Sequence, residues 1–220
     1  MLGRAINKAQ SALRIIRNGG PGPFLHHLRC QFYDRATFLA LERLLDEEVE
    51  PVPCAVDYEL AVASDEDMEE VGAAGKSEGG ESAWELIGRK WYYDSGFRDC
   101  YLARDRATGE PCFVQFVVPR AQYDQIDPGF GHRLPPIRDD ELWMENSYTF
   151  KKFRGKKVMS SVLIDLGEIA RKQGFRRIVT YIREDNVPSI KGCQRAGFKV
   201  YGRVPERKFL FSTTRDYGKA

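Results

Sequence analysis

The sequence predicts an α/β or α+β fold, in which helices cover a central sheet, with a helical extension at the amino terminus. Short apolar runs typical of strands alternate with segments of helical period along the second half of the chain. The hydrophobic content of 42% and charged content of 30% are those of a globular protein. No apolar run reaches the roughly 18 to 20 residues that a membrane span needs. We therefore predict an extension over residues 1–54 and one domain over 55–220.

The extension is predicted to hold two helices. Apolar residues recur at spacings of three and four over residues 2–16, and the basic residues lie mostly on the other face. The Gly/Pro linker at 19–23 ends this helix, and a second helix is predicted over 24–49, before the prolines at 51 and 53. The first helix suits a peripheral membrane contact or a subunit contact, a homodimer included, or else it packs on its own domain.

The hydrophobic periodicity and the positions of glycine and proline predict the helices and strands of the domain. The predicted strands lie at 58–63, 101–105, 112–118, 142–150, 177–182, 199–204 and 208–212. Helices are predicted after the N-cap Ser64, at 84–92, at 158–173 before Gly174, and at 188–196. Residues 72–80 are small and polar and predict a loop. Residues 122–140 hold too many prolines and glycines for regular structure, and long loops of this kind often carry function.

Cysteine usage narrows the class of protein. The five cysteines are an odd number with no C-x-x-C pair, and the three histidines form no metal-ligand pattern with them. This composition predicts neither a disulfide framework nor a metal site. Basic residues interrupt the amino-terminal apolar positions too often for a secretory signal, so we expect a protein kept in the reducing cytoplasm.

Charge is segregated along the chain. Residues 46–85 hold fourteen acids against Lys76 alone, and residues 151–177 hold nine basic residues against Asp165 and Glu168. The acidic stretch and the sequence pI of 8.2 argue against an extended basic footprint, so we expect no nucleic-acid partner. Acidic walls around an acceptor site would favour a cationic amine.

The basic block contains a turn suited to an anion. The predicted strand ending at Phe150 passes through residues 151–157, which contain four lysines, Arg154 and Gly155, straight into a helix. Free amides at a helix amino terminus, with a glycine and basic side chains around them, are suited to a phosphate. Asn186 opens the next helix after the following strand, so two helix starts meet at the edge of the sheet where open α/β sheets place ligands.

At these residues the chain resembles the GCN5-related N-acetyltransferase (GNAT) family. The family's R-G-x-G-x-G/A turn is matched by residues 154–159, and its N-x-x-A/S segment with a later G-F pair is matched by Asn186, Ser189, Gly197 and Phe198. The resemblance covers roughly residues 58–211. It implies the GNAT fold, a mixed, mainly antiparallel central sheet with helices on both faces. It also implies acetyl-CoA as acyl donor, no metal, and an amine of a small molecule or peptide as acceptor.

The resemblance further implies roles for individual residues. Glu145, on the strand before the turn, matches the general base of some members, with Glu141 and Glu184 as substitutes. Cys193 stands where many members have a tyrosine that protonates the departing thiolate, so Cys193 is the candidate acid and Tyr201 the fallback. The candidate coenzyme-binding residues are Ser147, Tyr148, Thr149, Arg154, Gly155, Lys156, Lys157, Val158, Met159 and Asn186. Backbone groups of the first three would pair with the pantetheine arm and polarise the thioester carbonyl.

Alternatives to this function stay open. Lys157 and Met159 stand where the family has small residues that let the cofactor approach the backbone. Together with Cys193 they motivate a second hypothesis, a non-catalytic acyl-CoA-binding sensor or partner module with the same fold. An enzyme that uses a longer acyl donor is a third.

Overall fold

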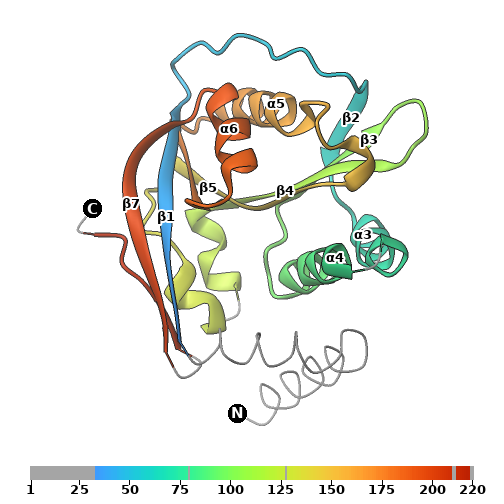
Figure 1. Ribbon diagram of the computed structural model, residues 1–220. Helices are drawn as coiled ribbons and strands as arrows, with labels where there is room; N and C mark the ends of the chain where they lie inside the picture. The colour runs from blue at the N-terminus through green and yellow to red at the C-terminus, as the bar shows by residue number, and fades with distance from the viewer. Residues whose placement is uncertain (1–32, 79, 127, 210–211, 219–220) are drawn as a thin grey trace.

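The structure is a computed structural model that describes residues 33–218 apart from 79, 127 and 210–211. One eight-stranded sheet runs through this part of the chain in the order β2-β3-β4-β5-β6-β1-β7-β8 (Figure 1). The strands are β1 (Tyr33–Leu44), β2 (Tyr58–Val62), β3 (Cys100–Asp105), β4 (Pro111–Pro119), β5 (Glu141–Thr149), β6 (Arg177–Arg183), β7 (Lys199–Phe209) and β8 (Ser212–Arg215). Only β5 and β6 are parallel neighbours in this sheet, and the other pairs are antiparallel. The predicted mixed, mainly antiparallel sheet is confirmed.

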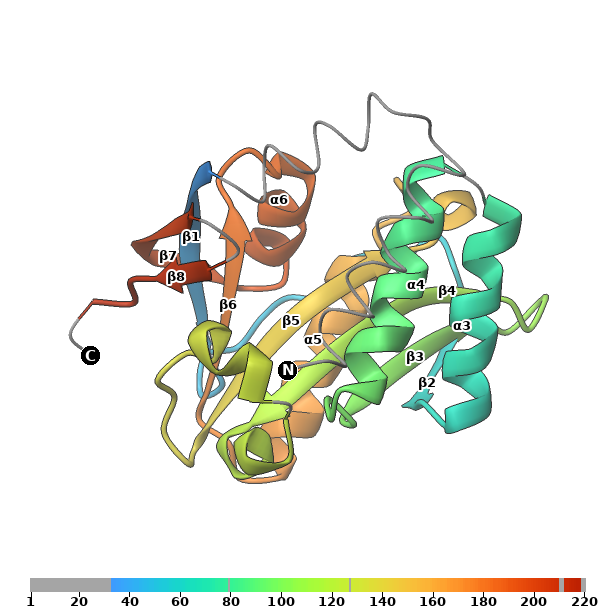
Figure 2. The same ribbon diagram turned by 90° about the horizontal axis from the view of Figure 1, so that it is seen from below.

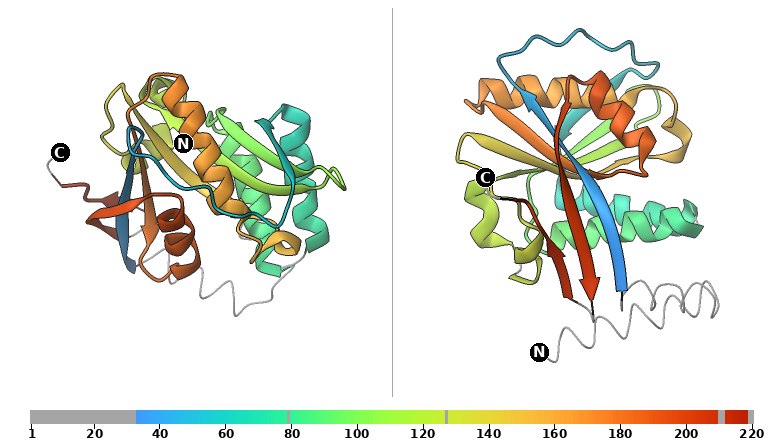
Figure 3. Two further views of the ribbon diagram at one scale, coloured as in Figure 1. Left: turned by 90° about the horizontal axis from the view of Figure 1, so that it is seen from above. Right: turned by 60° about the vertical axis from the view of Figure 1, so that its left-hand side comes forward.

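Helices cover both faces of the sheet, as predicted. α3 (Asp65–Glu78) and α4 (Gly80–Asp94) lie on one face, and α5 (Val158–Lys172) and α6 (Val187–Arg195) lie on the other (Figure 3). The 3-10 helices η1 (Arg120–Gln125) and η2 (Pro128–Arg133) lie on the same side as α4 (Figure 2). η3 (Lys151–Phe153) connects β5 to the segment before α5.

α5 shows how the sequence builds this packing. Its buried side chains recur at helical spacing and include Val158, Val162, Leu163, Leu166 and Ala170. This stripe packs on β4 and β5. Polar side chains such as Asp165 lie on the outer face, where Tyr58 of β2 donates from its hydroxyl to Asp165 at 2.6 Å, whereas the buried Ser160 donates to the carbonyl oxygen of Gly192.

The helix predicted over residues 24–49 is wrong where the structure describes it. β1 lies between β6 and β7 and pairs with both strands. A strand that has neighbouring strands on both sides and covering layers on both faces buries the side chains that point to either face. Ala40 and Leu41, which are successive residues, are both buried here. The run therefore lacks the polar alternation of a surface strand, and its leucines and alanines favour a helix by propensity. Residues 1–32, with the first predicted helix and the linker, lie outside the described residues.

Two further boundaries differ from prediction. The loop predicted over 72–80 is wrong because α3 continues to Glu78. A Cβ on Gly75 would lie 2.8 Å from the carbonyl oxygen of Ala83, so the small residues here permit the close approach of α3 and α4. The break predicted between 204 and 208 is wrong because β7 continues through Pro205 to Phe209, and Ser212, the last residue of the strand predicted at 208–212, already belongs to β8.

Candidate functional site

The turn between β5 and α5 has the geometry of an anion site. Gly155 and Lys157 both adopt left-handed backbone conformations, with φ of 78° and 63°. The amides of Val158, Met159 and Ser160, in the first turn of α5, make no backbone hydrogen bond among the described residues. They lie at the positive end of the helix dipole, so the turn offers both donors and partial positive charge to an anion.

The turn accommodates the two residues that depart from the family pattern. Lys157 holds the left-handed conformation that glycine adopts without strain, which costs a residue with a Cβ roughly 1 to 2 kcal/mol. Met159 lies against Gly192 of α6, where an added Cβ would come within 2.8 Å of the methionine sulfur. Met159 therefore fills the space between α5 and α6 that the missing side chain of Gly192 leaves.

β5 and β6 separate beside this turn. Their parallel pairing ends at Met144 and Thr180, whereas β6 goes on pairing with β1. Phe150 donates its amide to β4 at 3.1 Å, so antiparallel alternation directs the amides of Ser147 and Thr149 away from β4. These two amides therefore face the side of β5 from which β6 has diverged.

A β-bulge holds β5 in shape at this opening. Asn146 has a φ of 58°, and the register with β4 shifts opposite Gln115. Arg89 of α4 donates to the carbonyl oxygens of Asn146 at 3.1 Å and Ser147 at 2.7 Å. The buried Gln115 donates to the carbonyl oxygen of Glu145 at 3.0 Å and accepts from the Ser147 hydroxyl at 2.6 Å. Burial lowers the pKa of Arg89 to about 10, which leaves it charged at neutral pH.

Some backbone groups predicted to contact the cofactor already have partners. The carbonyl oxygen of Ser147 accepts from Arg89, and that of Thr149 accepts from Arg154 Nε at 3.1 Å. Arg154 also lies over the ring of Tyr148, 5.3 Å from its centroid. A ligand that pairs with β5 here would use the amides of Ser147 and Thr149 rather than these carbonyls.

Glu145 lies at the point of separation and is half-buried. By strand alternation its side chain is on the face that carries α4 and η2. Burial raises the pKa of the Glu145 carboxyl, and the charges of Arg215, Arg133 and Arg89 oppose that rise only in part. Among the described residues no donor hydrogen-bonds to this carboxylate. A carboxylate with a raised pKa and no bonded donor is a stronger proton acceptor than an ordinary glutamate.

Ionisable side chains from several elements surround Glu145, and we call them together the Glu145 cluster. Its members are Tyr92 of α4, Glu145, Arg133 of η2, Glu206 of β7, Arg215 of β8 and Tyr217. Buried polar atoms without a hydrogen-bond partner are concentrated here, among the described residues: Tyr92 Oη, Arg133 Nε, Arg215 Nη1 and, on the same strand as Glu145, Trp143 Nε1. Each such atom costs about 1 to 3 kcal/mol. Their concentration on one face indicates a site that a ligand or water completes.

The two substitutes predicted for Glu145 lie elsewhere. Glu141 is buried at the other end of β5, where Arg177 donates to it at 2.9 Å and the amide of Arg138 donates at 3.0 Å. Burial would raise its pKa, but these hydrogen bonds and charges outweigh burial and lower it. Glu141 is therefore part of an ion-pair network. Glu184 is exposed, and its amide donates to the carbonyl oxygen of Thr37 at 3.0 Å.

The candidate proton donors have contrasting environments. The Cys193 side chain is 3% exposed, and burial raises the pKa of its thiol to about 12. Tyr201 is exposed, and its hydroxyl lies 3.0 Å from that of Tyr181. Burial and this hydrogen bond raise the pKa of Tyr181. Tyr181 is level with Glu145 across the separation, because Met144 is registered with Thr180.

α6 begins and ends as predicted. The side chain of Asn186 accepts from the amide of Ser189 at 3.3 Å and caps the helix, and Gly197 follows it with a φ of 85°. A cavity of approximately 540 Å³ lies between residues 47–53 and the end of α6, and Lys157 forms part of its wall. This cavity adjoins the turn before α5. Asn186 itself makes no contact with the turn that would assign it to the same site.

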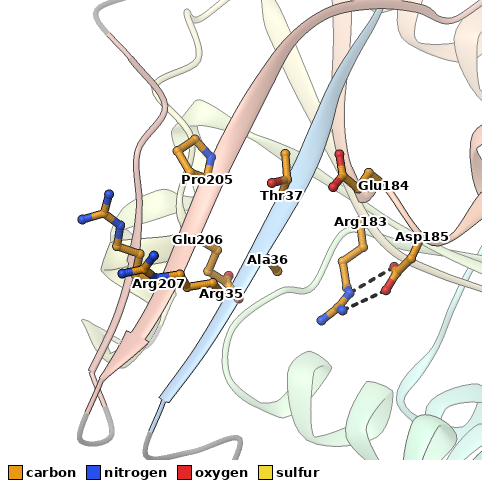
Figure 4. Close-up of a pocket in the computed structure, with 9 residues that line it drawn as sticks. All are labelled: Arg35, Ala36, Thr37, Arg183, Glu184, Asp185, Pro205, Glu206 and Arg207. Atoms are coloured by element: carbon orange, nitrogen blue, oxygen red, sulfur yellow. Dashed lines mark hydrogen bonds and ion pairs between the residues drawn. The ribbon is translucent and has the colours of Figure 1, made fainter.

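A second cavity of approximately 370 Å³ lies at the carboxyl end of β6 (Figure 4). Its wall includes Glu206 of the Glu145 cluster. Three arginines from three strands, Arg35, Arg183 and Arg207, also line it. Arg183 is paired with Asp185 at 2.9 Å.

Other kinds of site find no support in the described part of the chain. No group of three or more His, Cys, Asp or Glu side chains there has the arrangement of a metal site. Cys54, Cys100, Cys112 and Cys193 are free thiols, and Cys30 is outside the described residues. None of the described helices is long and apolar enough to cross a membrane.

Sequence reasoning missed Arg89, Gln115 and Arg215. Arg89 lies three residues after Leu86 in a predicted helix and therefore on its apolar face. Its charge at that position was the only sign in the sequence that Arg89 has a buried role. Gln115 interrupts an otherwise apolar strand in the same way. Arg215 belongs to no motif, and its position depends on how β8 returns to the sheet.

Comparison with known proteins supports the resemblance seen in the sequence. A model of the acetyltransferase (GNAT) family matches residues 84–198, more than half of the 220 residues. None of the curated proteins matches the chain in sequence. The matched range holds most of α4 and all the elements from β3 to α6, whereas β1, β2, α3, β7 and β8 fall outside it.

Solved structures show the same fold at low identity. A GCN5-related N-acetyltransferase from Sphaerobacter thermophilus is 14% identical with a TM-score of 0.53, covering 88% of this chain and 58% of its own. A GNAT-family acetyltransferase from Colwellia psychrerythraea is 15% identical with a TM-score of 0.52, covering 86% and 63%. The GCN5-related glucosamine N-acetyltransferase region of a fungal multi-domain GH3 beta-N-acetylglucosaminidase is 13% identical with a TM-score of 0.57, covering 87% and 22%. The chain thus spans about three fifths of the length of the two bacterial structures.

Proposed function

Because the chain belongs to the acetyltransferase (GNAT) family, we propose that it transfers the acetyl group of acetyl-CoA to an amine of a small molecule or a peptide. One observation carries the proposal. β5 separates from β6 after Met144, one residue before the raised-pKa carboxyl of Glu145, and the same strand leads through the turn to the free amides at the start of α5. A thioester held by those amides would present its carbonyl beside a proton acceptor.

The turn before α5 has the groups that a pyrophosphate needs. The amides of Val158, Met159 and Ser160 would donate to phosphate oxygens, and the basic residues at 151–157 would balance their charge. The left-handed Lys157 and the placement of Met159 against Gly192 support binding despite the departure from the family pattern. The amides of Ser147 and Thr149 would orient the pantetheine arm along β5.

Bound acetyl-CoA supplies the activated acetyl group, and residues of the chain transfer the protons and stabilise the charge that develops. Glu145 takes the proton of the amine as the nitrogen forms its bond to the carbonyl carbon. An amide at the bulge, held in place by Arg89 and Gln115, donates to the oxyanion that forms. When the carbon–sulfur bond breaks, a protonated group returns a proton to the sulfur.

Two residues remain candidates for that last proton. Cys193 is protonated at neutral pH, as a general acid must be, but its side chain is nearly inaccessible. Tyr201 is accessible and belongs to a hydroxyl pair with Tyr181, which is level with Glu145. Comparing Cys193→Ser with Tyr201→Phe separates them, because only loss of the acid both lowers the maximal rate and removes the fall in rate at alkaline pH.

A turnover assay tests the proposed function. The full chain is incubated with acetyl-CoA and a panel of primary amines, and both free coenzyme A and the acetylated amine are measured. The proposal expects coenzyme release that depends on the amine and matches product formation one to one. Tight acetyl-CoA binding by calorimetry without any turnover would instead favour the non-catalytic binding module. Turnover of malonyl- or long-chain acyl-CoA alone would favour a different donor.

A further inference from the structure

Arg215 is a buried guanidinium with one hydrogen-bonding group left over. Its side chain is 7% exposed, and its Nε donates to Glu206 at 2.6 Å. The guanidinium lies over the ring of Phe38, 4.3 Å from the centroid, so the side chain extends from β8 across β7 to β1. Among the described residues its Nη1 makes no hydrogen bond, although the guanidinium also interacts with the hydroxyl of Tyr217. A buried donor of this kind is satisfied only by something that enters the site.

Strand register places Arg215 and Glu145 on the same face of the sheet. Arg215 is registered with Glu206 and Glu206 with Ala36, so these side chains share a face with Phe38. Across β1, Phe38 is registered with Arg183, two residues beyond Tyr181 on β6. Tyr181 is the residue level with Glu145, and the alternation therefore continues to β5.

The charges on this face agree with a short distance between the side chains of Arg215 and Glu145. Burial alone would lower the pKa of Arg215, but the carboxylates of Glu145 and Glu206 outweigh burial and raise it. Tyr217 connects this region to Glu145 through Arg133. Its hydroxyl donates to the carbonyl oxygen of Arg133, and the charge of Arg133 opposes the rise in the pKa of Glu145. η2, which carries Arg133, contacts β8, which carries Arg215.

A cavity of the right size adjoins these groups. The space of approximately 370 Å³ at the end of β6 has Glu206 in its wall and therefore lies next to Arg215 (Figure 4). Small-molecule pockets in proteins begin at about 300 Å³. Of the arginines that line it, Arg183 is registered with Phe38 and shares the face of Arg215, whereas Arg35 and Arg207 are registered with each other and alternate with Ala36 and Glu206.

Three acidic residues of α3 are paired with arginines. On α3, Asp65 pairs with Arg98 at 2.7 Å, and Asp67 and Glu70 pair with Arg104 at 2.5 and 2.6 Å. These ion pairs join α3 to Arg98 and to Arg104 of β3 and neutralise part of the negative charge of α3. The face around Glu145 carries guanidinium groups instead.

From these placements we infer that the acceptor amine carries an oxyanion, a carboxylate or a phosphate, and that Arg215 binds this oxyanion through Nη1. The amine end would lie at Glu145, and the oxyanion end would lie at Arg215, beside Glu206. A zwitterionic acceptor fits the alternating charges of this path better than a diamine, because each end meets a group of opposite charge. This inference rests on the proposed acetyl transfer, since it takes Glu145 as the position of the reacting amine.

Matched amines test the inference directly. Short ω-amino acids and ω-aminoalkyl phosphates are compared with n-alkylamines and α,ω-diamines of the same chain length, as acceptors for the full chain with acetyl-CoA. We expect kcat/KM to be roughly tenfold or more higher for the oxyanion-bearing amines, the usual contribution of a hydrogen bond to a charged group. The carboxylate and phosphate arms distinguish the two kinds of oxyanion. Equal or better use of alkylamines or diamines would overturn the inference and leave the proposed transfer standing.

Arg215→Lys isolates the contribution of Nη1. A lysine can still pair with Glu206 but lacks the planar fork that reaches a second oxygen. The preference for oxyanion-bearing amines should fall roughly tenfold, through KM for the acceptor, with KM for acetyl-CoA unchanged. Arg203→Gln is the control, because Arg203 is exposed on β7 and is registered with Leu39 on the opposite face. An equal effect of both variants, or none of Arg215→Lys, would contradict the assignment.

A binding measurement separates this inference from the proposed function. Calorimetry of the coenzyme A complex with glutarate and with inorganic phosphate should show binding of at least one of them, which Arg215→Lys weakens. Such binding without turnover of any amine would refute acetyl transfer but support the oxyanion site, and absence of binding would refute the site. If Arg215→Lys does not fold, the Glu206→Gln/Arg215→Gln double variant removes the ion pair as a unit and allows the same measurements.

Discussion

Glu141 and Glu145 lie at different places on one strand and have opposite electrostatics. Glu141 has hydrogen bonds to Arg177 and to the amide of Arg138, which hold its pKa below the ordinary value of 4.5. Glu145 has no such donor, and burial holds its pKa above that value. The presence or absence of hydrogen-bond donors thus distinguishes a carboxylate that stabilises the fold from one that is available for proton transfer.

For Glu145→Gln we expect turnover to fall roughly a hundredfold or more, because an amide cannot accept the proton. Acetyl-CoA affinity should stay the same. The fold should be as stable as the native protein or more so at neutral pH, since a raised carboxyl pKa means that ionisation of Glu145 opposes folding above its unfolded pKa. Steady-state kinetics, calorimetry and urea unfolding measure the three quantities. A loss of coenzyme binding as large as the loss of turnover would indicate a structural role.

For Glu141→Gln we expect the reverse pattern. A lowered pKa means that ionised Glu141 stabilises the fold above its unfolded pKa, and this contribution is lost as the pH falls through the folded pKa. Breaking one partner of a buried ion pair costs about 3 kcal/mol. Urea unfolding at neutral pH should show that loss, and the difference from the native protein should shrink in acid. A difference that stays constant with pH would show that packing rather than charge is responsible.

At the scale of elements, the site depends on two interruptions of regular structure in and after β5. The bulge at Asn146 turns the strand as it leaves β6, and Arg89 and Gln115 hold its carbonyls. The left-handed turn at Gly155 and Lys157 then aims the start of α5 at the same opening. Strained backbone of this kind persists only where the surrounding contacts fix it, and it gathers at functional sites.

Gly155→Val should weaken acetyl-CoA binding roughly tenfold or more, about 1.4 kcal/mol, because a β-branched residue cannot hold a φ of 78° without strain and the turn must change shape. Calorimetry with acetyl-CoA measures the effect. Gly109→Val is the matched control, since Gly109 has a φ of 73° in the β3–β4 turn, and a Cβ at either glycine would meet nothing within 4 Å. Both variants should lose similar stability, and only Gly155→Val should lose affinity. Equal affinities would exclude the turn from the site.

At the scale of the whole molecule, the sheet is completed by its first described strand. β1 lies between β6 and β7, so residues distant in sequence fix the geometry of the half of the sheet that carries Arg215. The family match begins only at residue 84, and β1 is therefore a contribution from outside the matched range. Loss of β1 would separate β6 from β7 and with them the two ends of the Glu145 cluster.

Leu41→Ala should cost about 3 kcal/mol of folding free energy, because the side chain is 0% exposed in the centre of the sheet and its removal leaves a cavity. Leu44→Ala is the control on the same strand, where the side chain is 40% exposed, and it should change stability by less than about 0.5 kcal/mol. Urea unfolding of both variants measures the difference. Similar small losses would mean that residues 33–44 do not belong to the core, as an appended helix would not.

The sequence by itself determined the elements whose signals are local. The turn at 154–159, the cap at Asn186 and the helix end at Gly197 are each written in neighbouring residues, because a helix terminus needs particular side chains and backbone angles at that point. The candidate base Glu145 came from the family resemblance, by its position on the strand before the turn. Local chemistry and the family resemblance were enough for these positions.

Only the tertiary structure decided what depends on pairing between distant segments. β1 has the leucines and alanines of a helix and became a strand because β6 and β7 each offered a partner. Arg89, Gln115 and Arg215 come from three separate elements, and no local pattern relates them to Glu145. Hydrogen-bond partners and burial are properties of the packed chain, so the electrostatics that distinguish Glu145 from Glu141 arise only when the sheet has closed.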